Sequence, residues 1–126
     1  MHESRRDAAC AELVARCFAA RTAAHFLHLR STSFAQHAAI AEFYTAIVDK
    51  ADAYAECHMG VEGVFKSFPA IAVPLGSDPL GLLTDLHDWV SKHRDACACG
   101  TTELANLIDE ILAVIDRAYY KLKFLK

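Results

Sequence analysis

Proline is scarce in this 126-residue chain and is confined to one short stretch. The three prolines are Pro69, Pro74 and Pro79, and long proline-free segments lie on both sides of them. Because a proline inside a helix removes a backbone hydrogen bond and clashes with the preceding turn, its absence favours helices in both segments. Apolar residues make up 54% of the chain and charged residues 23%, which argues against disorder and fits one domain over residues 1–126.

The chain also lacks an excess of positive charge and a long apolar run. Its net charge of −3 argues against a general affinity for nucleic acid, and Arg5 and Arg6 are too few for a basic DNA-binding arm. No apolar run approaches the ~20 residues that span a membrane. No signal peptide with a cleavage site is recognisable near the N-terminus. We therefore expect a cytoplasmic protein that does not bind membranes or nucleic acid.

The five cysteines are an odd number, and without a secretory signal they predict reduced thiols. Cys10 and Cys17 are seven residues apart on one face of a predicted helix. A thiol in such a position commonly behaves as a small buried apolar group. We therefore interpret this pair as part of the core.

A second group of cysteines raises the question of zinc. Cys97 and Cys99 are separated by one residue, and His93 lies four residues before Cys97. A structural zinc site needs a second paired element, and only Cys57 with the adjacent His58 offers one. Thiols at the end of a helix are the favoured interpretation.

The apolar periodicity predicts an all-α fold with four helices. The first covers about residues 3–29. The sequence from Ser33 to Gln36 fits a capping box that begins the second helix. This helix is expected to run to Met59 and to stop at Gly60, a residue type suited to a helix C-terminus.

The second helix carries a predicted packing seam with alternating steps of three and four residues. Its members are Phe34, His37, Ile40, Tyr44, Ile47, Ala51, Tyr54 and His58. Such spacing is typical of left-handed bundle packing. Asp78 and Pro79 begin the third helix, which Gly100 ends. Thr101 or Thr102 caps the fourth helix, whose apolar seam is unbroken to Leu125.

Residues 60–77 do not follow a helical pattern, since Gly60, Gly63, Pro69, Pro74 and Gly76 interrupt them. A connection of this length is uncommon in a compact domain. It is long enough to cross the length of a bundle. We therefore predict a ferritin-like four-helix bundle with a long crossover between its second and third helices.

Four residues at fixed intervals are the candidate metal ligands: His25, His37, Asp52 and Glu56. Asp52 and Glu56 are four residues apart, so their carboxylates share one helical face. Imidazoles and carboxylates are the ligand types of diiron sites in helical bundles. The alternatives are a solvated acidic face, which Lys50 nearby supports, and hydrogen-bonded core histidines.

The segment 25–60 resembles the Dps family, the ferritin-like mini-ferritins named for DNA protection in starved cells. That family has a histidine at the end of its first helix, a second histidine twelve residues later, and a carboxylate pair spaced by four on the second helix. Here His25 and His37 are twelve residues apart, Asp52 follows fifteen residues after His37, and Glu56 completes the pair. The stretch from Arg30 to His37 also resembles small uncharacterised proteins encoded by tailed phages.

The resemblance implies a metal site between two subunits of a homo-oligomer. His25 and His37 of one copy would face Asp52 and Glu56 of another copy, and together they would bind iron or a similar divalent metal. The implied activity is ferroxidase activity, in which peroxide or dioxygen oxidises ferrous iron and ferric oxide collects inside a hollow shell.

The chain departs from the family pattern in three respects. The family's further acid, four residues after the second histidine, is Ala41 here, and the adjacent Glu42 is turned by ~100° around the helix. The usual tryptophan after the first histidine is Phe26, and no lysine-rich tail is present. The DNA-binding property of the family is therefore not expected, and a degenerate metal site is consistent with Ala41.

Two alternatives remain open from the sequence. The same bundle without a metal centre would act as a structural or partner-binding protein, and the apolar residues at 64–75 could dock a protein partner. His28 and His58 could support the metal or add a ligand. Their favoured interpretation is that of surface histidines.

Overall fold

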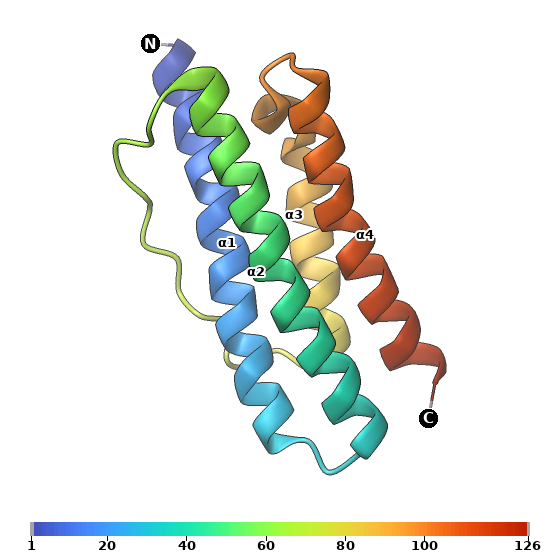
Figure 1. Cartoon of the computed structure of the whole chain (residues 1–126). Coiled ribbons are helices and arrows are strands. Elements are labelled where there is room, and N and C mark those ends of the chain that lie inside the picture. The colour runs from blue at the N-terminus through green and yellow to red at the C-terminus, as the bar shows by residue number, and fades with distance from the viewer. Residues whose placement is uncertain (1, 126) are drawn as a thin grey trace.

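The computed structural model describes residues 2–125, with side chains from residue 7 onward, as four helices without a strand. The helices are α1 (His2–Arg30), α2 (Phe34–Glu62), α3 (Pro79–Ala98) and α4 (Thr102–Phe124). Figure 1 shows them side by side as one bundle. The predicted all-α class with four helices is confirmed.

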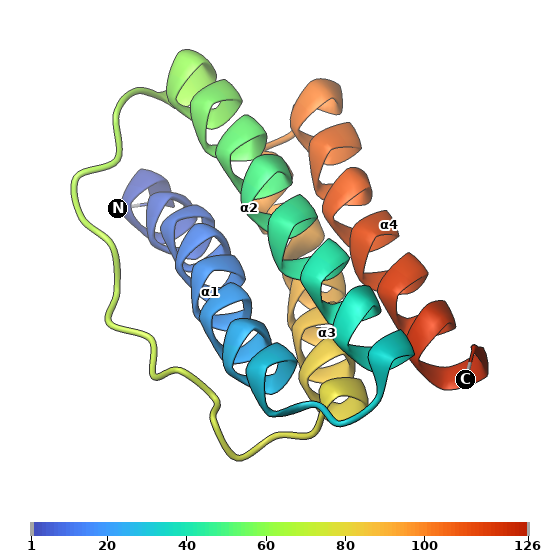
Figure 2. The ribbon, with the colours of Figure 1, turned by 60° about the horizontal axis from the view of Figure 1, so that its bottom comes forward.

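The helices form a four-membered bundle in which α1 and α2 make an antiparallel hairpin (Figure 1). The helix α3 then runs in the same direction as α2, and α4 returns antiparallel to α3, as the two views agree (Figures 1 and 2). The principal packing contacts join α1 to α2 and α3, and α4 to α2 and α3. The pairs α1–α4 and α2–α3 therefore lie across the diagonals.

Apolar side chains from all four helices fill the interior. Leu13, Ile47, Leu83 and Ile108, one from each helix, are each at most 2% exposed. The predicted seam of α4 is buried through its packed length at Leu104, Ile108, Ile111, Ile115 and Ala118. Only its last member, Leu125, is exposed, because it follows the end of the helix.

Side chains cap the second and third helices where the sequence predicts. The Ser33 hydroxyl accepts a hydrogen bond from the Gln36 amide at 3.3 Å. The reciprocal half of the capping box is absent among the described contacts, because the Gln36 side-chain oxygen accepts from the Ser31 hydroxyl at 2.8 Å. Asp78 accepts from the Gly81 amide at 2.6 Å, and Pro79 occupies the first helical turn.

The predicted end of α2 at Gly60 is wrong by one turn. The helix continues to Glu62, and Gly63 adopts a φ of 98°, with its N–H donating to the Met59 carbonyl at 3.0 Å. Either glycine is chemically suited to this role. The chain turns at the later one, where the crossover begins.

The predicted seam of α2 is confirmed in its central part. Ile40, Ile47, Ala51, Tyr54 and His58 are buried. Phe34 is 85% exposed, because it begins α2 at the α1–α2 corner, which reaches past the nearby ends of α3 and α4 (Figure 1).

The connection between α2 and α3 contains no helix over residues 64–78. It leaves α2 at one end of the bundle and reaches α3 at the opposite end (Figures 1 and 2). Phe65 is the buried residue near its start, and Val73 packs partly against the core. None of the described helices combines the length and apolar character needed to cross a bilayer.

Candidate functional site

The structure places the two predicted histidine ligands at the α1–α2 corner. His25 lies in the last turns of α1 and stacks on Tyr44, with ring centroids 4.5 Å apart. His37 lies in the second turn of α2 and stacks on His28 at 3.6 Å. All four rings are half-buried.

Reciprocal hydrogen bonds fix the orientation of two of these rings. The Nδ1 of His37 is 2.9 Å from the His28 carbonyl oxygen, and the Nδ1 of His28 is 2.8 Å from the His37 carbonyl oxygen. A carbonyl only accepts, so each Nδ1 carries the proton and donates it. The Nε2 of a neutral ring is then left with its lone pair, as in many histidines that bind metals. His28 is therefore not the surface histidine that the sequence suggested.

The two predicted carboxylate ligands, Asp52 and Glu56, are exposed in the second half of α2. His37 and Asp52 are fifteen residues apart on the same helix, a separation of about 22 Å along its axis. Within one described chain the four predicted ligands therefore do not converge. The site between two copies remains a prediction.

The departure at Ala41 has a structural counterpart. Glu42 forms an ion pair with Lys121 of α4, with a 2.7 Å distance between the Lys121 Nζ and a carboxylate oxygen. Its side chain therefore faces α4. As the sequence predicted, Glu42 therefore does not take the place of the acid that Ala41 lacks.

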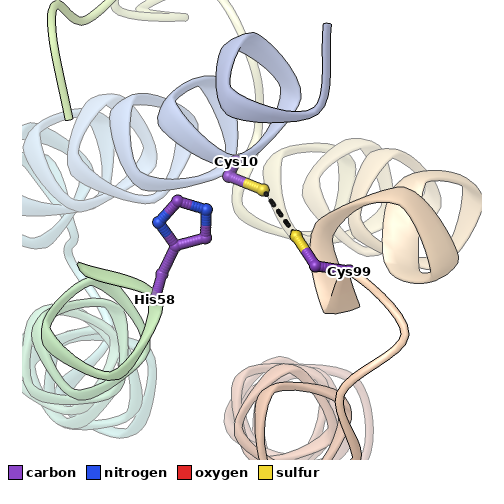
Figure 3. A group of neighbouring side chains, drawn as sticks. All are labelled: Cys10, His58 and Cys99. Carbon is purple, nitrogen blue, oxygen red and sulfur yellow. Dashed lines mark hydrogen bonds between the residues drawn. The ribbon is translucent and has the colours of Figure 1, made fainter. Parts of the chain in front are cut away.

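A different group of ligand-type side chains does converge, at the opposite end of the bundle. Cys10 of α1, His58 of α2 and Cys99, which ends α3, offer one sulfur or nitrogen atom each, and these atoms lie within 4.8 Å of one another. Figure 3 shows the His58 imidazole turned toward Cys10, and the two sulfur atoms facing each other. We name these three residues the Cys-His-Cys cluster.

The cluster lies largely inside the protein. Cys10 and His58 are 0% and 1% exposed, and Cys99 is half-buried. The two sulfur atoms of Cys10 and Cys99 are 3.7 Å apart. Cys97, also buried, directs its thiol to the Ala9 carbonyl at 3.5 Å and stays outside the cluster.

Burial and hydrogen bonding shift the pKa values of two members of the cluster. The pKa of His58 is lowered by desolvation, which disfavours the imidazolium form. The pKa of the Cys10 thiol is raised strongly by its hydrogen-bond interaction with Cys97 and by burial. The Nδ1 of His58 is buried and has no hydrogen-bond partner among the described residues. Both shifts favour the neutral forms of Cys10 and His58.

Only part of this cluster was predictable from the sequence. The pairing of Cys97 and Cys99 with Cys57 and His58 was the zinc hypothesis, but Cys10 was interpreted as a core residue and His58 as a surface histidine. The surface position of His58 is wrong. The available signal was the seam of α2, since His58 follows Tyr54 by four residues and Ala51 by seven. The role of Cys10 had no sequence signal, because only the packing of α1 brings its thiol near His58.

Comparisons with known proteins identify a family but no activity. No curated protein and no solved structure matches the chain. A family model described as a family of unknown function, DUF5856, matches residues 28–122. The matched range includes His37, Asp52, Glu56 and two members of the Cys-His-Cys cluster, and it begins after Cys10 and His25. Because this range covers most of the sequence, the chain belongs to the DUF5856 family.

Proposed function

We propose that this protein is a ferritin-like, Dps-like homo-oligomer that binds ferrous iron between subunits and oxidises it. His25 and His37 of one copy and Asp52 and Glu56 of another copy would hold the iron. The resemblance of residues 25–60 to the Dps family supports this assignment, as does the direction of the helices, in which a long crossover makes α2 and α3 parallel.

The observation that carries the proposal is the fixed ring of His37. Its Nδ1 donates to a backbone carbonyl at 2.9 Å, so the opposite nitrogen is oriented and available for a metal. The carboxylates of Asp52 and Glu56 are exposed and so are accessible to a second copy. Ligands that are oriented but too distant to meet within one chain fit a site completed by another chain.

Exposed apolar side chains support an association at the same corner. Phe26, Leu29 and Phe34 are 50%, 68% and 85% exposed and lie next to the α1–α2 turn that carries His25 and His37. Clustered apolar exposure of this kind commonly marks an interface. A second copy would cover this surface while it completes the metal site.

Anaerobic loading with ferrous iron tests the proposal. The wild-type protein should retain iron after desalting, and the double variant His37→Ala, Glu56→Ala should retain much less. The matched control is His87→Ala, Glu103→Ala, which removes the same residue types elsewhere and should bind like wild type. Equal, negligible uptake in wild type and the His37/Glu56 variant would contradict the proposal, and so would a monomeric mass in light scattering.

A second function fits one specific observation. The crossover exposes Val64, Phe68 and Leu75 by 79%, 56% and 57%. A metal-free bundle that binds a protein partner through this segment would account for these exposed apolar side chains. It would also account for an alanine, rather than an acid, at position 41. An oligomer that takes up no iron would favour this function over the first.

A further inference from the structure

The Cys-His-Cys cluster joins three helices at the end of the bundle opposite His25 and His37. Cys10 comes from the first half of α1, His58 from the last turns of α2, and Cys99 from the end of α3 (Figure 3). Residues that are 48 and 41 positions apart in the sequence thus meet at one point. Two thiols and one imidazole are the donor set of thiophilic divalent cations such as zinc.

The spacing of the two sulfur atoms matches tetrahedral zinc. Two thiolates, each ~2.3 Å from a zinc ion at the tetrahedral angle, lie about 3.8 Å apart. The Cys10 and Cys99 sulfur atoms are 3.7 Å apart. All three donor atoms lie within 4.8 Å of one another, so small side-chain movements would complete the geometry.

The backbone at Cys99 adds an observation. Cys99 has a φ of 55° and is the only non-glycine residue at positive φ in the described chain. Residues other than glycine and asparagine rarely occupy this left-handed conformation, because the Cβ meets the backbone. The turn nevertheless carries a cysteine there, and its thiol faces Cys10.

The surroundings of the cluster are compatible with a cation. The carboxylates of Asp7 and Glu62 act on His58 as nearby negative charges, which would also attract a cation. A cleft of roughly 700 Å³ between the start of α1, the end of α2 and the crossover is lined by His58, Asp7 and Glu62. This cleft offers an entry path from solvent.

We propose that Cys10, His58 and Cys99 of one chain bind a thiophilic divalent cation such as zinc through three protein ligands. Zinc binding would displace the two thiol protons, which pass to solvent. A water molecule would take the fourth coordination position of the ion, on the half-buried side of Cys99. The ion would tie α1, α2 and α3 together. This site is separate from the proposed intersubunit iron site.

Cobalt(II) under anaerobic, reducing conditions is the probe for this site. Titration of the wild-type protein should produce the thiolate-to-cobalt charge-transfer band and the intense visible bands of tetrahedral cobalt, saturating near one ion per chain, and zinc should abolish them. Cys10→Ala removes a ligand itself. It should therefore weaken cobalt binding by more than the ~10–100-fold that follows the loss of a residue that only supports a ligand. His58→Gln should do the same.

Cys17→Ala is the matched control, since it removes another buried cysteine from the same helix, and it should retain the wild-type spectrum. His37→Ala, Glu56→Ala should also retain it, which separates this site from the iron site. The absence of cobalt–thiolate bands in the wild-type protein, or equal spectra in Cys10→Ala and Cys17→Ala, would overturn the proposal. So would a reduced protein that binds no metal but forms a Cys10–Cys99 disulfide on oxidation.

A second measurement does not depend on the folding of variants. X-ray absorption at the zinc edge of the zinc-loaded wild-type protein should show two sulfur ligands at ~2.3 Å and nitrogen or oxygen ligands at ~2.0–2.1 Å. A shell of nitrogen and oxygen alone would exclude a thiolate site and overturn the proposal.

Discussion

At the scale of single residues, Tyr54 shows how a polar group is accommodated in the interior. Its side chain is 0% exposed, and its hydroxyl donates to the Cys97 carbonyl at 2.7 Å. Tyr54 belongs to α2 and Cys97 to α3, which lie across a diagonal of the bundle. This hydrogen bond therefore connects α2 and α3, although each of them packs mainly against α1 and α4.

Replacing Tyr54 by phenylalanine should lower the free energy of unfolding by about 1–2 kcal/mol. The ring would still fill its space, but the Cys97 carbonyl would keep only the weaker contacts with the Cys10 thiol at 3.7 Å and the Cys99 thiol at 3.8 Å. Urea denaturation measures the change. Tyr120→Phe is the control, because Tyr120 is exposed on α4 and its change should stay within ~0.5 kcal/mol. Equal losses in the two variants would show that the buried hydrogen bond does not contribute.

At the scale of elements, an ion pair fastens α3 to α4 on the outside of the bundle. The Arg94 guanidinium makes two hydrogen bonds to the Asp109 carboxylate, at 2.7 Å and 2.9 Å. These bonds lower the pKa of Asp109 below its ordinary value. Both side chains are substantially solvated, so the contribution of the pair to stability is small.

The Arg94–Asp109 ion pair should make the thermal stability depend on pH in the acidic range. Because the pKa of Asp109 is lower in the folded protein than in the unfolded chain, its stabilising contribution is present above about pH 4 and is lost as the pH falls through the folded value. The Tm of Asp109→Asn should therefore be slightly below that of wild type at pH 7, and the difference should shrink at pH 3. Asp88→Asn, an exposed change on α3, should show no such narrowing. A constant difference between wild type and Asp109→Asn at both pH values would contradict this interpretation.

At the scale of the whole molecule, the crossover is the segment least supported by regular structure. It has no helical hydrogen bonds over residues 64–78, yet it runs the length of the bundle. Phe65 anchors its start, since its ring stacks on His58 with centroids 4.5 Å apart and planes 1° from parallel. The order of the crossover therefore depends on the same buried histidine that belongs to the Cys-His-Cys cluster.

Loss of the Phe65 anchor should open the crossover locally. In Phe65→Ala, limited trypsin digestion after the adjacent Lys66 should be faster than in wild type, because local opening exposes the backbone to the protease. Val64→Ala is the control, since Val64 is 79% exposed and contributes little packing. Mass spectrometry of the first fragments measures the rate. Similar cleavage rates in the two variants would show that Phe65 does not hold the segment.

The sequence predicted the elements well, and the reasons are local. Seams with steps of three and four residues, the Asp78–Pro79 start and the proline-free segments act within a few turns of chain, so the four helices follow from them. The end of α2 was misplaced because Gly60 and Gly63 are equally suited to stop a helix. Phe34 was misplaced because periodicity does not indicate where a helix extends beyond its neighbours.

The sequence by itself determined the all-α class, the four helices and the long non-helical connection, because each depends on interactions between near neighbours. Only the tertiary structure decided which ligand-type side chains meet. It brought Cys10, His58 and Cys99 together, whereas the separation of His37 from Asp52 already follows from their spacing along one helix and leaves their site to a second copy as a proposal. The physical reason is that helix packing, rather than spacing along the chain, sets the distance between side chains on different helices.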